Sequence, residues 1–284
     1  MHRKGIIYDV GATFSGFGWR FSTRPDFDPG VTRRELEIIH RDLHCNAVRI
    51  NGTDVARLLT TAEDALVEGL EVWLSPSLFE QSQQHTIDGM VRAAKAAEPL
   101  QQRYPERLMF VPGTEATLFT RGIVPGNTIT KRFTSPANRA AMKAGKHNAP
   151  LNDYLARVCR AVRAAFGGQL SYASLPFEAV DWDLFDIIGI DHYRDARVKD
   201  SYTERLTPLL RLGKPVVVTE FGEPGMTYSE EPRYDLDMSG MALVKTYTSG
   251  HGTTYPDMTW EPKQAFRAVA GYYAKDSAST TAGD

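Results

Sequence analysis

Two glutamates follow short apolar segments of the sequence. Glu220 lies near the end of the segment KPVVVTEFG, residues 214–222, in which residues 215–218 have the β-branched composition of a buried strand. Glu115 follows a second apolar run, residues 108–111, and a Pro-Gly break. A carboxylate at the end of a buried strand is costly unless something there uses it. Together, two such carboxylates could act as acid and nucleophile on one bond, whereas each alone could simply pair with a local Arg.

Eight apolar segments alternate with helical patterns, in a chain of 284 residues. This order favours the α/β class and a single (β/α)₈ TIM barrel over an open doubly wound sheet, since no GxGxxG or Walker loop follows a strand. One catalytic domain is predicted over residues 1–274, followed by a loosely attached polar tail, 275–284. The predicted strands cover residues 5–10, 46–50, 71–76, 108–111, 169–174, 186–190, 215–218 and 240–247.

The helices between these strands are predicted from apolar residues three and four positions apart. The first begins at Thr32, which forms a capping box with Glu35 ahead of Leu36. Residues 11–21, GATFSGFGWRF, are predicted to form an aromatic-rich loop at the barrel mouth. The remaining helices are predicted over residues 54–69, 86–104, 151–166, 202–212 and 262–273.

Composition narrows the classes of function. A net charge of -2 and a pI near 6.4 give no bias toward nucleic acid or membrane surfaces. The sequence has no secretory signal and no apolar run of bilayer length, so a cytoplasmic protein is expected. Cys45 and Cys159 lie in apolar surroundings and are predicted to be reduced structural thiols. The His and Cys residues lack metal-site spacing, so no metal or other cofactor is predicted.

The carboxyl ends of all strands meet at one face of a barrel, so a ligand is expected there. Ordinary structural roles remain open for several residues at this face. Arg49 could be an interior ion-pair partner, Trp73 a core residue, and Glu178 the start of a surface helix. Asp191 could point outward, because it and His192 must face opposite sides of a strand. The candidate substrate-binding residues are Asp9, Trp19, Arg49, Trp73, His192, Tyr193 and Tyr247.

Four short motifs, in order and at matching spacing, cover nearly the whole chain. They are VRI at the end of the second strand, an acidic residue after the fourth, HY after the sixth and Glu after the seventh. This series resembles the clan A glycoside hydrolases, including family 5. The resemblance implies that Glu220 is the nucleophile, Glu115 the general acid/base, Arg49 a charge partner of the nucleophile and Tyr193 its hydrogen-bond donor. It also implies that His192 lines the same pocket.

The sequence departs from that pattern at two places. Thr114 stands where the family usually has Asn before the acid/base, and Lys245 and Tyr247 stand where a Trp commonly ends the eighth strand. The sequence also resembles uncharacterised bacterial proteins labelled abortive-infection proteins, a label that supplies no mechanism.

The expected function is a retaining glycoside hydrolase that acts through a glycosyl-enzyme intermediate, with an oligosaccharide, polysaccharide or glycoside as substrate. For this mechanism we expect the two carboxyl groups to lie about 5 to 5.5 Å apart. A non-catalytic carbohydrate-binding or phage-defence-associated barrel is the alternative. A Schiff-base lyase would need a buried lysine at a strand end; Lys245 fits loosely and Lys214 lies at the wrong end of its strand.

Two charged segments and a set of aromatic residues complete the expectations. Residues 116–152 contain six Lys or Arg and no acidic residue, which favours a lid that pairs with the acidic segment after the seventh strand. At least one ring of an aromatic group is expected to line the cleft. That group is Phe14, Phe17, Trp19, Tyr247, Tyr255 and Trp260.

Overall fold

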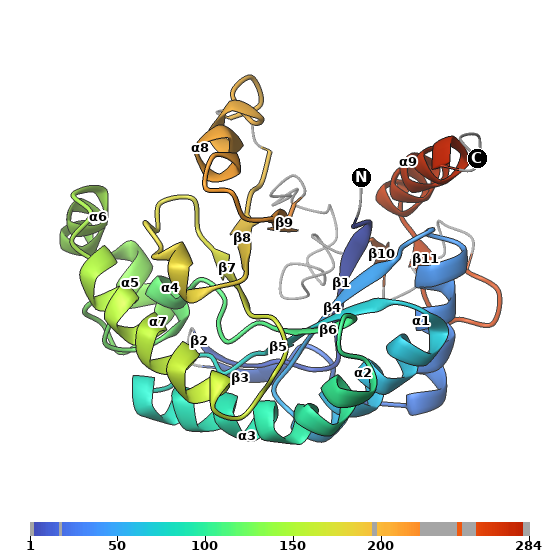
Figure 1. The fold of residues 1–284 in the computed structure, drawn as a ribbon, viewed down its shortest axis with the longest axis horizontal. Coiled ribbons are helices and arrows are strands. Elements are labelled where there is room, and N and C mark those ends of the chain that lie inside the picture. Colours follow the sequence, from blue (N-terminus) through green and yellow to red (C-terminus); the bar gives the residue numbers. More distant parts are fainter. Residues whose placement is uncertain (1–2, 17–18, 195–197, 222–242, 246–253, 281–284) are drawn as a thin grey trace.

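A computed structural model of the chain describes residues 3–16, 19–194, 198–221, 243–245 and 254–280. Within these residues the protein is a mixed helix and strand fold in which parallel strands form a curved inner layer and helices lie outside it (Figure 1). No described helix is both long and apolar enough to cross a membrane.

Seven of the described strands run parallel and follow one another in chain order. One sheet has the order β1-β4-β5-β6 and a second the order β7-β8-β9. Parallel bridges from Phe110 to Leu170 and from Thr114 to Ala173 join the two sheets. These strands are β1 (Gly5–Asp9), β4 (Ala47–Gly52), β5 (Glu71–Pro76), β6 (Leu108–Phe110), β7 (Ser171–Ser174), β8 (Ile187–Asp191) and β9 (Val216–Glu220).

Alternate residues of these strands belong to two separate apolar clusters. In β5, Val72 and Leu74 pack with the helices, whereas the side chain of Trp73 points to the other face. On that inner face, Trp73 belongs to a small cluster with Met109 and Ile187, against which Val217 packs. A separate inner cluster is the packing expected inside a barrel. The polar side chains of the candidate site lie next to this inner cluster, at the carboxyl ends of the strands.

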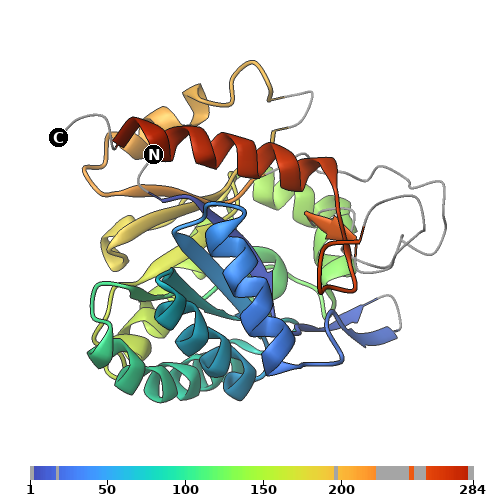
Figure 2. The same ribbon diagram turned by 90° about the vertical axis from the view of Figure 1, so that its right-hand side faces the viewer.

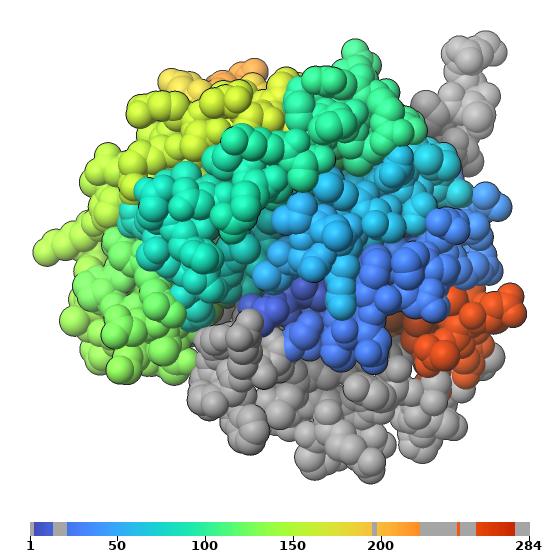
Figure 3. Space-filling model, turned by 90° about the horizontal axis from the view of Figure 1, so that it is seen from below, coloured from blue at the N-terminus to red at the C-terminus, as the bar shows by residue number. Residues whose placement is uncertain are grey.

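Helices cover the outer face of the strands. Seen from below, α1, α2 and α3 follow one another across the surface, from blue to green (Figure 3). The predicted helix over 202–212 is instead two short pieces, η2 (Glu204–Leu206) and α8 (Thr207–Leu210). The other helices of the outer layer are α1 (Pro29–Arg41), α2 (Val55–Glu68), α3 (Gln83–Arg103), α7 (Asn148–Arg163) and the 3₁₀ turn η1 (Trp182–Leu184).

The first helix begins earlier than the capping box predicts. Its N-cap is Asp28, whose carboxylate accepts hydrogen bonds from the backbone N–H groups of Gly30 and Val31. Thr32 is buried inside the helix. Glu35 accepts hydrogen bonds from other parts of the chain, including the Arg24 guanidinium. The predicted capping box is therefore wrong, because Asp28 caps the helix and Glu35 has long-range partners.

Two further segments differ from their predictions. The predicted loop 11–21 contains an antiparallel hairpin, β2 (Thr13–Gly16) and β3 (Trp19–Ser22). The basic segment 116–152 contains three short helices and the start of α7. Arg132 in this segment is fully buried and pairs with Glu80 at 3.1 Å, so the segment is tied to the loop after β5. The short helices are α4 (Ala116–Phe119), α5 (Ile129–Thr134) and α6 (Pro136–Lys143).

The eighth parallel strand predicted over 240–247 is not confirmed. Its described part contains β10 (Val244–Lys245), which pairs antiparallel with β11 (Glu261–Pro262). This pairing arises because Tyr255 and Trp260 pack with the outer apolar cluster near α1, which brings β11 beside Val244. The described residues therefore do not show a closed ring of eight strands.

The last helix, α9 (Gln264–Thr280), lies beside the first strand, and its residues from 275 onward belong to the predicted polar tail (Figure 2). Tyr273 connects the two elements. Its hydroxyl donates to the Gly5 carbonyl at 3.1 Å, and its own carbonyl accepts from the Lys4 ammonium at 3.0 Å. The acidic segment after β9, the proposed partner of the basic segment, lies outside the described residues.

Both cysteines are free and buried in the outer apolar cluster. Burial raises the pKa of the Cys45 and Cys159 thiols to about 12, which keeps both thiols protonated at neutral pH. They have the environment of structural residues.

Candidate active site

Glu220 lies at the end of β9, where an irregularity in pairing redirects the strand. Residues 216–218 of β9 pair in simple register with β8, but Asp191 pairs with Glu220 instead of Thr219. Such an irregularity allows consecutive side chains to point toward the same side of a sheet. The Thr219 hydroxyl donates to Asp191 at 2.7 Å, and the Glu220 carboxylate contacts Arg49.

Arg49 organises the polar groups around Glu220. Its side chain is 5% exposed, and its guanidinium donates to the Glu220 carboxylate at 3.1 Å. It also donates to the hydroxyls of Thr114 and Ser75, at 2.5 and 3.3 Å. Arg49 and Ser75 lie in neighbouring strands. Arg49 is three residues before Gly52, the last residue of β4, and Ser75 is one residue before Pro76, the last residue of β5. Thr114, the residue that replaces the expected Asn, therefore holds the arginine.

The second oxygen of Glu220 has a different donor. The phenol of Tyr193 donates to this oxygen at 2.5 Å, so each carboxylate oxygen of Glu220 has its own partner. Burial, and then the negative charge of Glu220, raise the pKa of Tyr193, which keeps the phenol protonated as a donor. An arginine and a phenol both stabilise negative charge on the carboxylate between them.

Asp191 is a third carboxyl group in the site. Its side chain is fully buried, 3.8 Å from the Arg49 guanidinium, and faces the interior, so the alternative in which it points outward does not hold. One of its oxygens has no hydrogen-bond partner among the residues that the structure describes. Burial, and then the charge of Glu220, raise the pKa of Asp191 to about 8 against the opposing effect of Arg49. The site therefore holds a proton that an exposed aspartate would release.

This proton makes stability depend on pH. Between about pH 4, the ordinary pKa of aspartate, and about pH 8, the folded protein retains a proton that the unfolded chain has lost. Stability must therefore fall as pH rises through this window. Asp191→Asn cannot ionise and is expected to gain stability relative to the parent as pH rises. Urea unfolding at pH 5, 6, 7 and 8 measures this difference.

The exposed Asp153 provides the matched control, since Asp153→Asn removes the same charge outside the site. This control should keep the parent's dependence on pH. A free-energy difference between Asp191→Asn and the parent that stays constant from pH 5 to 8 would contradict the assignment.

Glu115 has an unusual backbone conformation. It precedes α4 with φ 43° and ψ 47°, in the left-handed region that costs a non-glycine residue about 1–3 kcal/mol. Its N–H donates to the Ala173 carbonyl at 2.8 Å. The next N–H, of Ala116, donates to the Tyr172 hydroxyl at 2.7 Å. Backbone strain of this kind is maintained only where neighbouring groups enforce it.

Glu178 is the group behind these contacts. It is 8% exposed and accepts hydrogen bonds from the Thr117 N–H at 3.1 Å and the Tyr172 hydroxyl at 2.9 Å. It also accepts from the Leu175 N–H at 2.9 Å. Glu178 thus belongs to the buried support of the turn after Glu115 rather than to a surface helix start. Its place after a strand was visible in the sequence, but its long-range partners were not.

The carboxyl groups of Glu115, Asp191 and Glu220 meet in one place. One oxygen from each lies within 4.8 Å of the others. Burial raises the pKa of Glu115 well above its ordinary value, and the charges of Asp191, Glu220 and then Glu178 add to this effect, while Arg49 opposes it. The two glutamates therefore differ in environment. Glu115 is held as a protonated acid, whereas Glu220 receives two donors that stabilise negative charge.

The same three carboxyl groups are, among the described residues, a group that could hold a metal ion. Their oxygen atoms would suit a hard divalent cation. However, Arg49 already provides positive charge next to two of them. The Arg49 guanidinium and the protons retained by Glu115 and Asp191 balance the charges of the three carboxyl groups, so we assign no metal.

Two predicted ligand residues lie away from the carboxyl groups. The His192 ring stacks on Tyr202 with centroids 4.1 Å apart, and its Nε2 contacts the Tyr202 carbonyl at 2.8 Å. The Trp73 ring is 3% exposed and donates to Glu71 at 2.6 Å, within the inner apolar cluster. Because alternate residues face opposite sides of a strand, Asp191 enters the site and His192 turns outward. Trp73 belongs to the inner apolar cluster next to the site.

The remaining predicted ligand residues are only partly described. Asp9 lies at the end of β1, where its carboxylate accepts from the Gly11 N–H at 2.9 Å and supports a turn. Trp19 has its backbone in β3, and its side chain, like the whole of Tyr247, lies outside the described part. Tyr255 and Trp260 pack together, with centroids 5.0 Å apart, near α1. The expectation of a cleft-lining ring in this group stays a prediction.

No protein-family model matches the sequence, and no curated protein matches it. The structure is similar to that of a GH113 β-1,4-mannanase, with a TM-score of 0.59, 15% identity and coverage of 96% of this chain and 98% of the other. A GH113 β-mannanase from Alicyclobacillus acidocaldarius gives a TM-score of 0.53 at 15% identity, with coverage of 96% and 97%. A GH5 cellulase from an Icelandic hot spring isolate gives 0.50 at 12%, with coverage of 93% and 94%.

These likenesses show the fold alone, which the chain shares with GH113 mannanases and a GH5 cellulase, proteins of clan A of the glycoside hydrolases. They span nearly the whole length of both chains, in agreement with the sequence resemblance to this clan. They do not support the resemblance to abortive-infection proteins.

Proposed function

We propose that the protein is a retaining glycoside hydrolase with Glu220 as nucleophile and Glu115 as general acid/base, on a TIM barrel. The observation that carries this proposal is the approach of the two carboxyl groups, whose nearest oxygens lie within 4.8 Å. Retaining enzymes hold their two carboxyl groups about 5–5.5 Å apart, whereas inverting enzymes leave roughly 6.5–9.5 Å for a water molecule. The fold and the different environments of the two glutamates support the same assignment.

In the first step, Glu220 attacks the anomeric carbon while Glu115 gives its proton to the departing oxygen. A covalent glycosyl ester forms on Glu220 and the glycosidic bond breaks. Arg49 and Tyr193 position Glu220 for this attack through their hydrogen bonds to its two oxygens. The raised pKa of Glu115 supplies the proton that the leaving group needs.

In the second step, water attacks the ester and Glu115 accepts its proton. Esterification removes the negative charge of Glu220, which is one of the charges that raise the pKa of Glu115. The pKa of Glu115 must therefore fall when the intermediate forms, and the same residue becomes a better base. Water attack then releases the sugar and restores both carboxyl groups.

The proposal is tested by a substrate panel with analysis of product configuration. β-1,4-Mannan and cellulose oligosaccharides come first, because GH113 mannanases and a GH5 cellulase share the fold. Proton NMR of the first product should show the anomeric configuration of the substrate, and a chelator should leave the rate unchanged. Initial product of inverted configuration would contradict the proposal. Binding of glycans without cleavage of any panel member would favour a non-catalytic barrel.

Glu178 is expected to act as a positioning residue for Glu115. Glu178→Gln keeps the shape of the side chain but replaces one acceptor oxygen with a donor, which conflicts with the N–H and O–H groups around it. A displaced Glu115 should lower kcat/KM, which reports formation of the intermediate, about 10²-fold on substrates with poor leaving groups. Aryl glycosides whose leaving group needs no proton should lose much less in kcat/KM.

Comparison of these two substrate types measures the effect. The exposed Glu204 supplies the control, and Glu204→Gln should match the parent on both. An equal loss on both substrate types would mean that Glu178 supports the fold alone, and would contradict the positioning role.

A further inference from the structure

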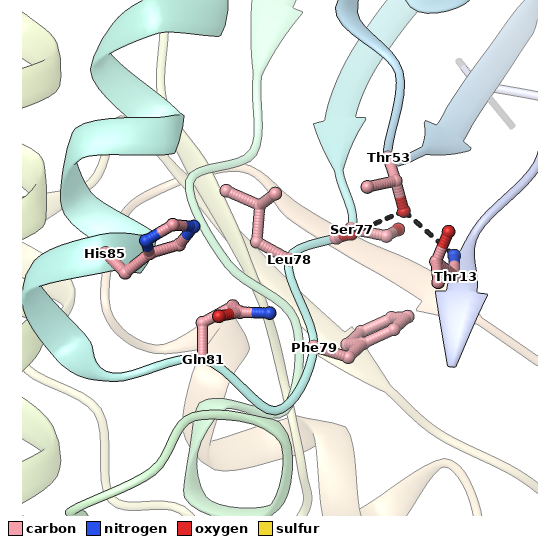
Figure 4. Close-up of a pocket in the computed structure, with 7 residues that line it drawn as sticks. All are labelled: Thr13, Thr53, Ser77, Leu78, Phe79, Gln81 and His85. Carbon is pink, nitrogen blue, oxygen red and sulfur yellow. Dashed lines mark hydrogen bonds between the residues drawn. The ribbon is translucent and has the colours of Figure 1, made fainter. Parts of the chain in front are cut away.

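A pocket of about 250 Å³ lies beyond the carboxyl ends of β4 and β5, where Thr53 and Ser77 directly follow the two strands (Figure 4). Its walls come from the hairpin strand β2, the loops after β4 and β5, and the first turn of α3. In Figure 4, Gln81 and His85 lie on one side, Thr13 and Thr53 lie on the other, and Phe79 lies between them.

The pocket is separate from the carboxyl groups but continues from the same strands. Thr53 follows Arg49 by four residues and lies just after the end of β4, which corresponds to about 13 Å along an extended chain. Ser77 follows Ser75 by two residues, or about 7 Å. These distances lead outward from the strand ends. A chain of sugar rings would span them from Glu220, whereas a single ring would not.

The lining contains neutral polar groups and apolar surface. It offers the hydroxyls of Thr13 and Ser77, the amide of Gln81 and the imidazole of His85, together with the ring of Phe79. Among the described residues, none of those that line the pocket is Lys, Arg, Asp or Glu. Hydroxyl and amide groups around an aromatic ring suit a ligand with many hydroxyls and an apolar C–H face. A carboxylate or phosphate on the ligand would be desolvated there without a cationic partner.

Hydrogen bonds hold the walls of the pocket together. The Thr53 hydroxyl accepts from the Thr13 N–H at 2.9 Å and donates to the Ser77 carbonyl at 3.0 Å (Figure 4). Ser77 in turn donates its N–H to the Gly52 carbonyl at 2.7 Å. Three chain segments are thereby fixed to one another before any ligand arrives.

The pocket is also connected to the turn that carries Glu115. The ring of Phe79 packs against that of Phe119 with centroids 4.4 Å apart. The N–H of Glu80 donates to the Phe119 carbonyl at 2.9 Å, and the N–H of Phe119 donates to the Glu115 carbonyl at 3.0 Å. A ligand seated on Phe79 would therefore lie at a fixed position relative to the acid.

We propose that this pocket is a remote subsite for a neutral sugar unit, so that the substrate is an uncharged oligosaccharide or polysaccharide rather than a small glycoside. This inference rests on the proposed function for the reaction, but binding at the pocket needs no turnover. Each sugar ring between Glu220 and Phe79 adds contact with the protein, and the ring that reaches the pocket adds the contacts of Gln81 and His85.

The test uses Glu220→Gln, which cannot cleave its ligand, and calorimetric titration with β-1,4-linked manno- and cello-oligosaccharides of two to six units. For at least one series, affinity should rise with length until one ring reaches the pocket. In the same background, Gln81→Ala with His85→Ala should lower the affinity for the long oligosaccharides at least fivefold, and the loss should vanish for the shortest. Gln84→Ala is the matched control, because Gln84 is exposed on the same helix and contacts Asp88.

Several results would overturn the proposal. These are affinity independent of length in both series, an unchanged affinity of the double variant for long ligands, or uronic acid oligomers that bind as tightly as neutral ones. Two further results distinguish failure of the proposed reaction from failure of the subsite. Length-dependent binding that the double variant loses, in a protein whose parent cleaves nothing, would keep the subsite and reject the hydrolase. Cleavage of long and short substrates with equal efficiency by parent and double variant would keep the hydrolase and reject the subsite.

Discussion

Glu220→Gln is expected to reduce turnover by on the order of 10⁴-fold or more, because an amide has the shape of the carboxylate but cannot attack the anomeric carbon. The variant should stay folded, since its amide oxygen can still accept from Arg49 or Tyr193. Affinity for the substrate should remain close to that of the parent. The measurement is kcat on the best substrate of the panel, together with ligand titration and thermal unfolding.

A control is available on the exposed surface, where Glu204→Gln makes the same chemical change and should leave kcat unaltered. Turnover of Glu220→Gln within tenfold of the parent, in a correctly folded sample, would exclude Glu220 as the nucleophile.

Glu115→Ala is expected to lower kcat about 10²–10⁴-fold on substrates whose leaving group needs a proton, because the proton donor is gone. Substrates with a good leaving group should still form the glycosyl intermediate. Its hydrolysis should then be slow, since the base that activates water is missing as well. Azide is a nucleophile that needs no base, so it should restore turnover of these substrates and give a glycosyl azide of retained configuration.

Comparison of the two glutamate variants separates their roles. Azide should not restore a product of retained configuration in Glu220→Gln, where no glycosyl ester can form. Equal residual activity and equal azide response in both variants would contradict the assignment. A glycosyl azide of inverted configuration from Glu115→Ala would contradict it as well.

The positions of the two glutamates were predictable, because a carboxylate that follows an apolar parallel strand lies at the face where the carboxyl ends of the strands meet. The sequence did not allow us to predict whether the side chain of Asp191 or that of His192 points into the site. Strand β8 is buried on both faces, so its sequence is uniformly apolar and does not reveal which residues point inward. The irregular pairing of β8 with β9 adds a second displacement that no local pattern encodes. The site thus has an aspartate where a histidine was expected.

Long-range partners account for most of the other differences. The left-handed conformation of Glu115 is supported by Tyr172 and Glu178, which lie more than fifty residues later in the chain. Likewise, the basic segment contains an arginine that is buried against Glu80, a partner that the charge of the segment alone does not reveal. Charge and spacing in the sequence do not identify the distant residues that a segment contacts in the fold. The strands were therefore predicted better than the segments between them.

The most direct test of the central claim is to trap the glycosyl intermediate and locate it. A 2-deoxy-2-fluoro glycoside of the sugar that the parent hydrolyses fastest, with a good leaving group, slows both steps but the second one more, so the ester on the enzyme accumulates. Mass spectrometry of the proteolysed protein should then find one added fluorosugar on the peptide that contains Glu220, and none in Glu220→Gln. A fluorosugar attached to any other residue, or steady hydrolysis of the reagent without a labelled enzyme, would contradict the account.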